Sequence, residues 1–222
     1  MPKNLPEKHA IIQNNGRFGI AAHLPAGLIT PEQLRRFADF AEKYRVEAVK
    51  ITSAQRLAFI GIDEADLDRA WEDLGEKPGM AIGMCVRSVK ICPGKTYCPY
   101  GHQDTLTVGM EIDRRLYGKS LPHKFKIAVS GCPFQCAENA IRDFGLVGYN
   151  NGWKAAVGGN GGPAPRLSQP LTKGLSDEAA IELAERVVKA FAGSGEKSRI
   201  GKWIEKIGLD EFKRLVGVEQ AS

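Results

Sequence analysis

The sequence lacks the hydrophobic segments that membrane insertion or export requires. No apolar run in its 222 residues approaches the roughly 18 residues that a transmembrane helix needs. Residues 1–6 also lack the apolar stretch of a secretion signal. We therefore expect a cytoplasmic protein with no membrane partner, long enough for one compact domain or for two small lobes.

The sequence also has little excess charge and no dense basic run. Its 31 Lys and Arg residues against 26 Asp and Glu residues give a formal net charge of +5, a weak footprint for nucleic-acid binding. The glycine-rich residues 158–162 lack the Gly-Lys-Ser/Thr ending of a phosphate-binding loop, and Glu196 interrupts a similar ending at residues 195–198. We therefore expect neither nucleic-acid nor nucleotide binding.

Cysteine is scarce and odd in number, with five residues. In a reducing compartment this pattern disfavours disulfides and favours metal binding or redox chemistry. Cys92 and Cys98 are separated by five residues, and Cys132 and Cys136 by three, so two loops offer four thiolates. Cys85 stands apart, and we interpret it as a buried core thiol.

Zinc and iron–sulfur centres both use four thiolates, and the spacing distinguishes them only in part. Structural zinc pairs usually have about two to four intervening residues, so the wider gap between Cys92 and Cys98 disfavours zinc. No His lies beside either pair to complete a zinc finger. Soft all-thiolate ligation suits iron–sulfur. Spacing alone favours iron–sulfur and leaves zinc and inert buried thiols open.

The first third of the sequence alternates strand and helix patterns. A capping box at Thr30 to Gln33 predicts a helix that runs to about Tyr44. Asp63 is expected to cap a second helix, which Gly75 ends. This order predicts a small α+β lobe whose helices cover one face of an antiparallel sheet. The expected strands are residues 17–23, 47–52 and 57–62.

A Pro-Gly pair at residues 78–79 predicts a boundary between a first domain, residues 1–78, and a second, residues 79–222. Beyond it we expect a helix over residues 104–117, another that begins at Ser176, and short helices within residues 198–216. The expected strands of this domain are residues 81–91, 124–130, 145–149 and 154–157.

Lys124 and Lys126 are two residues apart in one predicted strand. Their ammonium groups therefore share a face, with about 6.6 Å of rise between them. Phe125, Ile127 and Val129 face the other way and are expected to enter the core. From the pattern alone, an ordinary solvated strand face is favoured over the cationic wall of a site.

Four stretches resemble the siroheme-dependent nitrite and sulfite reductases. The family's cluster motif combines the two cysteine spacings, which are found here in VRSVKICPGKTYC, residues 86–98, and SGCPFQCAEN, residues 130–139. KITSAQR, residues 50–56, and LPHKFK, residues 121–126, match as well. The likeness follows a consistent order, and the chain most resembles the small, single-repeat, assimilatory-type sulfite reductases.

The resemblance implies an α+β fold in which a ferredoxin-like N-terminal lobe packs on a mixed α/β lobe that binds siroheme and a [4Fe-4S] cluster. It implies reduction of sulfite to sulfide, with nitrite reduction to ammonium or a non-catalytic electron-transfer subunit as alternatives. By resemblance, Cys136 ligates both the cluster and the siroheme iron. The cluster ligands it implies are Cys92, Cys98, Cys132 and Cys136.

The resemblance also implies which polar residues contact substrate and siroheme. Lys124, Lys126 and Arg87 are expected to bind the small oxyanion. Many sulfite reductases carry an arginine where this chain has Ala54, so Arg56 is the candidate there. The siroheme carboxylates are expected to contact Gln103, Asn139 and Arg142.

Large members of the family contain two copies of this arrangement, whereas this chain is about one copy long. We therefore hypothesise a homodimer in which the cations of one chain complete the cluster side of the other. No ferredoxin insert, flavin segment or dinucleotide-binding fingerprint is evident. A separate electron donor such as a ferredoxin is expected.

Overall fold

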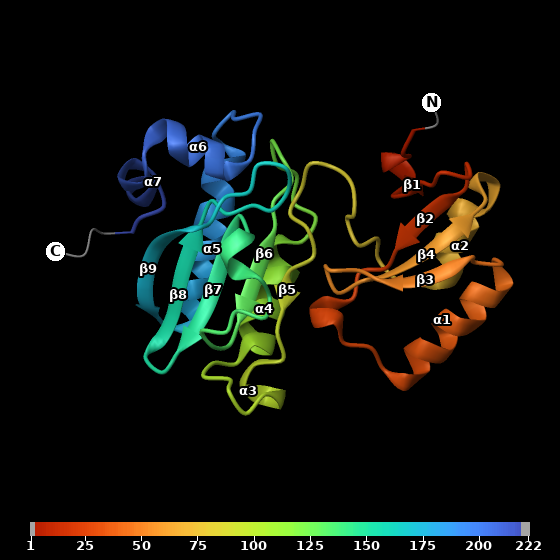
Figure 1. Cartoon of the computed structure of the whole chain (residues 1–222), viewed down its shortest axis with the longest axis horizontal. Coiled ribbons are helices and arrows are strands. Elements are labelled where there is room, and N and C mark those ends of the chain that lie inside the picture. Colours follow the sequence, from red (N-terminus) through yellow and green to blue (C-terminus); the bar gives the residue numbers. More distant parts are fainter. Residues whose placement is uncertain (1–2, 219–222) are drawn as a thin grey trace. The chain divides into compact units, whose positions relative to one another are not determined.

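The computed structural model describes residues 3–218 and contains two compact units that divide between Gly83 and Met84 (Figure 1). In the first unit, four antiparallel strands form a sheet in the order β1-β2-β4-β3. The strands are β1 (Ile11–Ile12), β2 (Phe18–Ala21), β3 (Ala48–Ile51) and β4 (Leu57–Ile62). The helices are α1 (Pro31–Lys43) and α2 (Leu67–Leu74), with short 3-10 turns η1 (Pro6–Lys8), η2 (Pro25–Gly27) and η3 (Glu64–Asp66).

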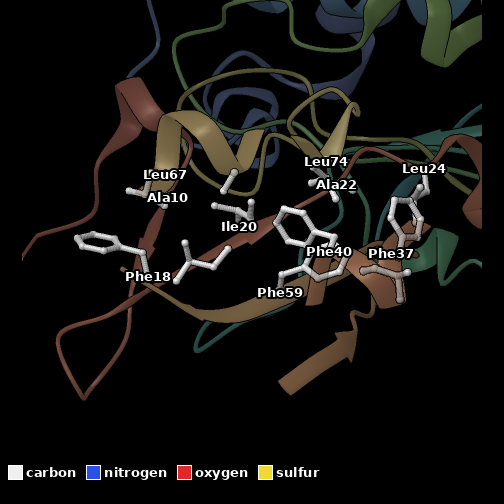
Figure 2. Close-up of a cluster of buried hydrophobic side chains, with 13 residues drawn as sticks. Ala10, Phe18, Ile20, Ala22, Leu24, Phe37, Phe40, Phe59, Leu67 and Leu74 are labelled. Carbon is white, nitrogen blue, oxygen red and sulfur yellow. The ribbon is translucent and has the colours of Figure 1, made fainter. Parts of the chain in front are cut away.

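The core of this unit combines aliphatic side chains with a group of phenylalanine rings, as Figure 2 shows. Phe59 of β4 is fully buried, and its ring lies 5.7 Å from that of Phe37 and 4.8 Å from that of Phe40. Both partners come from α1, so edge-on ring contacts hold this helix against the sheet. The predicted α+β lobe, with its antiparallel sheet, is confirmed.

The helix ends test the capping predictions. Thr30 and Gln33 form the predicted capping box, and Gly75 ends α2 in the left-handed conformation at φ 66°. The prediction for Asp63 is wrong, because its side chain makes no cap hydrogen bond. Its carboxylate instead accepts a 2.8 Å hydrogen bond from Arg17, and η3 precedes α2.

In the second unit, five strands form a mixed sheet in the order β5-β6-β7-β8-β9. The first three are parallel, and β8 and β9 join them antiparallel. Residues 81–91 form a strand only at their end, with isolated bridges at Cys85 and Val86, and β9 was not predicted. The strands are β5 (Lys90–Ile91), β6 (Ile127–Ser130), β7 (Phe144–Tyr149), β8 (Gly152–Val157) and β9 (Gln169–Leu175).

Helices α4 and α5 lie along one face of this sheet (Figure 1). Phe125, before β6, packs on Phe191 of α5 with ring centroids 5.8 Å apart, and Phe191 packs in turn on Trp203 of α6. The predicted helices are therefore confirmed, including the short ones near the C-terminus. The helices are α3 (Gly94–Tyr97), η4 (Asn139–Ile141), α4 (Thr105–Leu116), α5 (Asp177–Ala192), α6 (Ile200–Ile207) and α7 (Leu209–Leu215).

A buried amide fastens β6, β7 and η4 together. The amide nitrogen of Asn139 donates to the backbone oxygens of Ala128, at 3.0 Å, and Leu146, at 2.7 Å. Its oxygen accepts from the hydroxyl of Ser130, which accepts in turn from the backbone of Ala137. Asn139 is 1% exposed, so its side chain belongs to the sheet core.

A buried ion pair anchors the start of α6. Arg199 donates to both carboxylate oxygens of Asp143, at 2.8 and 2.5 Å, and Asp143 is fully buried. The same carboxylate accepts a 2.7 Å hydrogen bond from the backbone of Lys126. Burial raises the pKa of Asp143, and its bonds with Arg199 oppose that rise. Asp143 thus fixes the segment that carries Lys124 and Lys126.

Within residues 3–218, no helix has both the length and the apolar character needed to cross a membrane.

Replacing Asn139 with Ala is expected to lower the free energy of unfolding by about 1–3 kcal/mol, because two buried carbonyl oxygens lose a donor. Urea unfolding followed by far-ultraviolet circular dichroism measures this change. The exposed Asn151 is the matched control, and Asn151→Ala should alter stability by less than about 0.5 kcal/mol. Equal stability of the two variants would contradict the proposed role of Asn139.

Candidate functional site

Two cysteine loops leave the second sheet at the same edge. Strands β5 and β6 are parallel, with Ile91 opposite Val129. Cys92 follows β5 directly, and Cys132 lies two residues beyond the end of β6. The backbone of Cys92 donates a 3.0 Å hydrogen bond to Val129. Because the carboxyl ends of parallel strands share one edge, the fold brings the two loops together.

Gly131 joins these loops. Its backbone nitrogen donates to the sulfur of Cys92 at 3.1 Å, and its oxygen accepts from His102 and Gln103 at 2.8 and 3.2 Å. A side chain here would approach the Gln103 oxygen and the Gly94 Cα to 3.0 Å. A larger residue here would therefore crowd the segment that Gly131 binds. Hydrogen bonds to sulfur also tune the reduction potentials of iron–sulfur clusters.

The four thiols differ in exposure. Cys92 and Cys132 are 9% and 6% exposed, Cys98 is half-buried, and Cys136 is exposed. Across residues 3–218, no group of three or more His, Cys, Asp or Glu side chains gathers as a ready metal site. The donor chemistry nevertheless fits an iron–sulfur cluster, since two adjoining loops carry four thiols. Cys85 is buried, as predicted.

A cavity of about 620 Å³ opens beside Cys132. Both cysteine loops and the turn between β7 and β8 contribute to its walls. Its lining residues are Lys95, Pro99, Tyr100, Gly101, His102, Cys132, Pro133, Phe134 and Asn150.

Lys124 and Lys126 precede β6, at the amino end of the strand. Both are half-buried, whereas Phe125, Ile127 and Val129 are at most 1% exposed. The predicted apolar side is therefore confirmed, although the strand begins only at Ile127. The two lysines therefore lie at one end of β6 and Cys132 lies at the other.

Positive charge gathers around these lysines. Burial lowers the pKa of Lys126, and the charges of Arg142, Arg199 and Lys124 lower it further. Arg87 is 7% exposed, and burial and the charge of Arg199 lower its pKa too. Several cations are thus held close together at a partly desolvated place, where a bound anion would relieve their repulsion.

His123 and Arg142 each carry a buried side-chain nitrogen in the same region. The His123 Nδ1 and the Arg142 Nε are buried without a hydrogen-bond partner. Burial lowers the pKa of His123. Arg142 also forms an ion pair with Glu138. Glu138 forms a second ion pair with Lys90, at 3.1 Å. Burial raises the pKa of Glu138, but the bonds with these two cations outweigh it and leave the pKa lowered. Buried, unpartnered donors are suited to the carboxylates of an anionic ligand.

Arg56 belongs to the first unit. It is 8% exposed, so its side chain is buried although it carries a charge. Its backbone nitrogen donates to the Thr52 hydroxyl at 3.1 Å, and its side chain lies against Gly79.

Two of the three expected siroheme contacts have structural roles. The amide of Asn139 binds two strand carbonyls in the sheet core and its side chain is 1% exposed, and its expected contact with siroheme stays a prediction. The amide nitrogen of Gln103 donates to the Tyr149 backbone at 2.5 Å, and its backbone joins the cysteine loops. Arg142 keeps a buried donor, as described above.

Sequence reasoning missed Asp143, Arg199 and His123. Asp143 and Arg199 are 56 residues apart, and no local periodicity links them. A signal for His123 was present, since it lies within the LPHKFK stretch that resembles the reductases.

The two units match two family descriptions. Residues 11–77 match the "Nitrite/Sulfite reductase ferredoxin-like half domain". Residues 82–222 match the "Nitrite and sulphite reductase 4Fe-4S domain". Together these matches confirm the predicted fold, a ferredoxin-like unit followed by a mixed α/β unit.

Similarities to individual proteins support these family matches. The chain is 38% identical over 211 residues to an assimilatory-type sulfite reductase of Nitratidesulfovibrio vulgaris, covering 94% of this chain and 97% of that protein. It is 36% identical over 209 residues to a nitrite reductase [NAD(P)H] of Bacillus subtilis, covering 94% of this chain but only 26% of that protein. The Mycobacterium tuberculosis NirA structure shares the fold, with a TM-score of 0.80, 22% identity, and coverage of 90% of this chain and 40% of that chain.

The paired cysteine loops, the cationic region, both family matches and these relatives lead to one conclusion. The chain belongs to the nitrite and sulfite reductase family, a family of oxidoreductases whose cofactors are siroheme and a [4Fe-4S] cluster.

Proposed function

We propose that this protein reduces sulfite to sulfide, using electrons from a separate low-potential donor. The observation that carries the proposal is the layout of the second sheet, with thiols at the carboxyl end of β6 and partly desolvated cations at its amino end. The similarity in length to a sulfite reductase, of which 97% is covered, favours sulfite. Nitrite reduction to ammonium is the alternative, because nitrite is also a small oxyanion.

Cys92, Cys98, Cys132 and Cys136 are the proposed cluster ligands, and Cys136 is also proposed to ligate siroheme. When bound, the two groups would supply an electron store and an open metal position for substrate. The exposure of Cys136 supports this assignment, because a shared ligand must be reachable from outside the loop. The hydrogen bond from Gly131 to the Cys92 sulfur supports a thiolate there.

Lys124, Lys126 and Arg87 are proposed to bind the oxyanion, together with Arg56 of the first unit. A guanidinium can donate hydrogen bonds to two oxygens at once, and an ammonium is a compact charge that can also give up a proton. The lowered pKa of Lys126 makes this proton easier to release to an oxygen that leaves as water. Arg142 and Gln103 are proposed to contact siroheme carboxylates, and the buried Nε of Arg142 supports the first.

A non-catalytic electron-transfer subunit is the second candidate. Such a carrier needs the thiols but has no use for clustered, half-buried cations. The positions of Lys124, Lys126 and Arg87 therefore favour an enzyme.

The layout of β6 also supports a homodimer with shared sites. Its four residues span about 13 Å, with Lys126 before the strand and Cys132 after it. One chain thus presents its cations and its thiols at opposite ends of the same strand. In the proposed dimer, the cations of each chain complete the thiol end of the other.

The proposed activity is tested by anaerobic purification, followed by metal analysis, visible spectra and sulfide production with reduced methyl viologen. We expect iron, siroheme bands that shift on addition of sulfite, and sulfite-dependent sulfide. Cys132→Ser should lose most of the iron, whereas the buried control Cys85→Ser should retain it. A colourless zinc protein would refute the proposal, and iron without siroheme would favour the carrier.

The pH dependence tests Lys126. Burial lowers the pKa of Lys126 from the ordinary value of 10.5, so Lys126 loses its charge at a lower pH than an exposed lysine as the pH rises. We expect kcat/KM for sulfite to fall on the alkaline side. Lys126→Arg should move that fall to higher pH and lower kcat, because arginine retains its proton. The exposed control Lys119→Arg should leave the profile unchanged, and an unchanged profile in Lys126→Arg would contradict this role.

Mixing two inactive variants tests the shared site. Cys136→Ala alone, and Lys124→Ala with Lys126→Ala, should each lower kcat by about 10²-fold or more. Coexpression should restore roughly a quarter of wild-type activity, because half of the dimers are mixed and each has one intact site. No recovery, together with a monomeric mass in light scattering, would refute the dimer and leave the cations acting within one chain.

A further inference from the structure

The cavity beside Cys132 has no part in the substrate-binding scheme above. Of the four proposed cluster ligands in the described chain, Cys132 lines it and the proposed siroheme ligand Cys136 does not. The cavity therefore lies beside one proposed cluster ligand, near the carboxyl end of β6. Substrate reduction needs a route for electrons as well as a place for the anion.

Exposed aromatic rings rim this cavity. Tyr100 is 66% exposed and Phe134 is 74% exposed, although each comes from a different cysteine loop. Their rings meet edge to face, with centroids 5.8 Å apart. Tyr97, in the same loop as Tyr100, is 69% exposed. Clustered large apolar side chains on a surface typify contacts with another protein, and aromatic residues dominate their energies.

The charge of the rim identifies the kind of partner. The lining residues of the described chain include the cation Lys95 but no carboxylate. Lys154 adds a further exposed charge beside the turn that supplies Asn150, with its ammonium 3.7 Å from the ring centroid of Tyr149. The neighbouring Asp104 is used as the cap of α4, where it accepts from two backbone nitrogens. A cationic, aromatic face complements an acidic protein.

We infer that this face docks the electron donor, a small acidic protein that carries a low-potential one-electron centre. The inference rests on the proposed function. At each encounter the donor loses one electron and the proposed cluster gains it. Reduction of one hydrogen sulfite to hydrosulfide uses six such electrons and six protons and releases three waters. Donor docking and substrate binding thus use different residues, because the proposed oxyanion ligands Lys124, Lys126 and Arg87 do not line this cavity.

The experiment compares two donors with the loaded protein. Lys95→Glu combined with Tyr100→Ser should raise the KM for a reduced acidic ferredoxin by about tenfold or more, equivalent to about 1.4 kcal/mol. The KM for reduced methyl viologen and the kcat with it should remain unchanged, because this small dye needs no docking face. Salt should raise the ferredoxin KM of the wild type more steeply than that of the variant.

A matched control changes a lysine and a large apolar residue elsewhere on the same unit. Lys173 and Leu167 are both exposed, and Lys173→Glu with Leu167→Ser should leave both donors unaffected. An unchanged ferredoxin KM in the Lys95 and Tyr100 variant would overturn the inference. An equal loss of activity with ferredoxin and with methyl viologen would also overturn it, because the two substitutions would then have damaged the cysteine loops. Dissociation of a dimer by the two substitutions would overturn it as well, because the face would then be a contact between subunits. A wild type that reduces neither sulfite nor nitrite with methyl viologen would instead refute the proposed function.

Discussion

The parallel pairing of β5 with β6 is the constraint on which the site depends. Strand β5 is only two residues long, yet its register with β6 places Cys92 and Cys132 at one edge. Gly131 closes the arrangement, because its backbone binds the Cys92 sulfur on one side and the segment around Gln103 on the other. A loop that carries metal ligands gains precision when it begins at a fixed strand end, because few backbone angles remain free before the ligand.

The cations beside the same sheet are positioned by a buried carboxylate. Asp143 is fully buried, accepts from Arg199 through two bonds, and accepts from the backbone of Lys126 through a third. A buried carboxylate with these partners is costly to leave unpaired, so it fixes the geometry of whatever it binds. The N-terminal end of α6 and the Lys124 to Lys126 segment are therefore positioned by one side chain. The lysines need no direct contact with the cysteine loops to be held in place.

The sequence predicted those parts of the molecule that depend on local patterns. Capping at Thr30, the termination at Gly75 and the apolar alternation through Phe125, Ile127 and Val129 were all confirmed. Errors arose where distant partners compete. Asp63 has the chemistry of a helix cap, but Arg17 binds its carboxylate instead. Similarly, residues 81–91 have strand character, but a strand forms only where β6 lies alongside.

Polar residues in the site motif show the same limit. Asn139 follows the second cysteine pair, and its amide chemistry suits both cofactor binding and backbone pairing. The choice is made by Ala128 and Leu146, whose carbonyls come from two different strands. Cysteine spacing is different, because it reports the geometry of a ligand set within a few residues. For that reason the motif identified the family directly, whereas the roles of single polar residues required the fold.

The partial burial of the cations links stability to chemistry. Desolvation lowers the pKa of Lys126 and Arg87, and neighbouring positive charge lowers both further. Keeping these groups charged lowers the stability of the folded protein, and an anion bound among them would offset that cost. The surroundings that make these charges costly to the fold therefore strengthen anion binding. They also make the Lys126 proton easier to release, which suits both parts of the role proposed for it, binding of the oxyanion and its protonation.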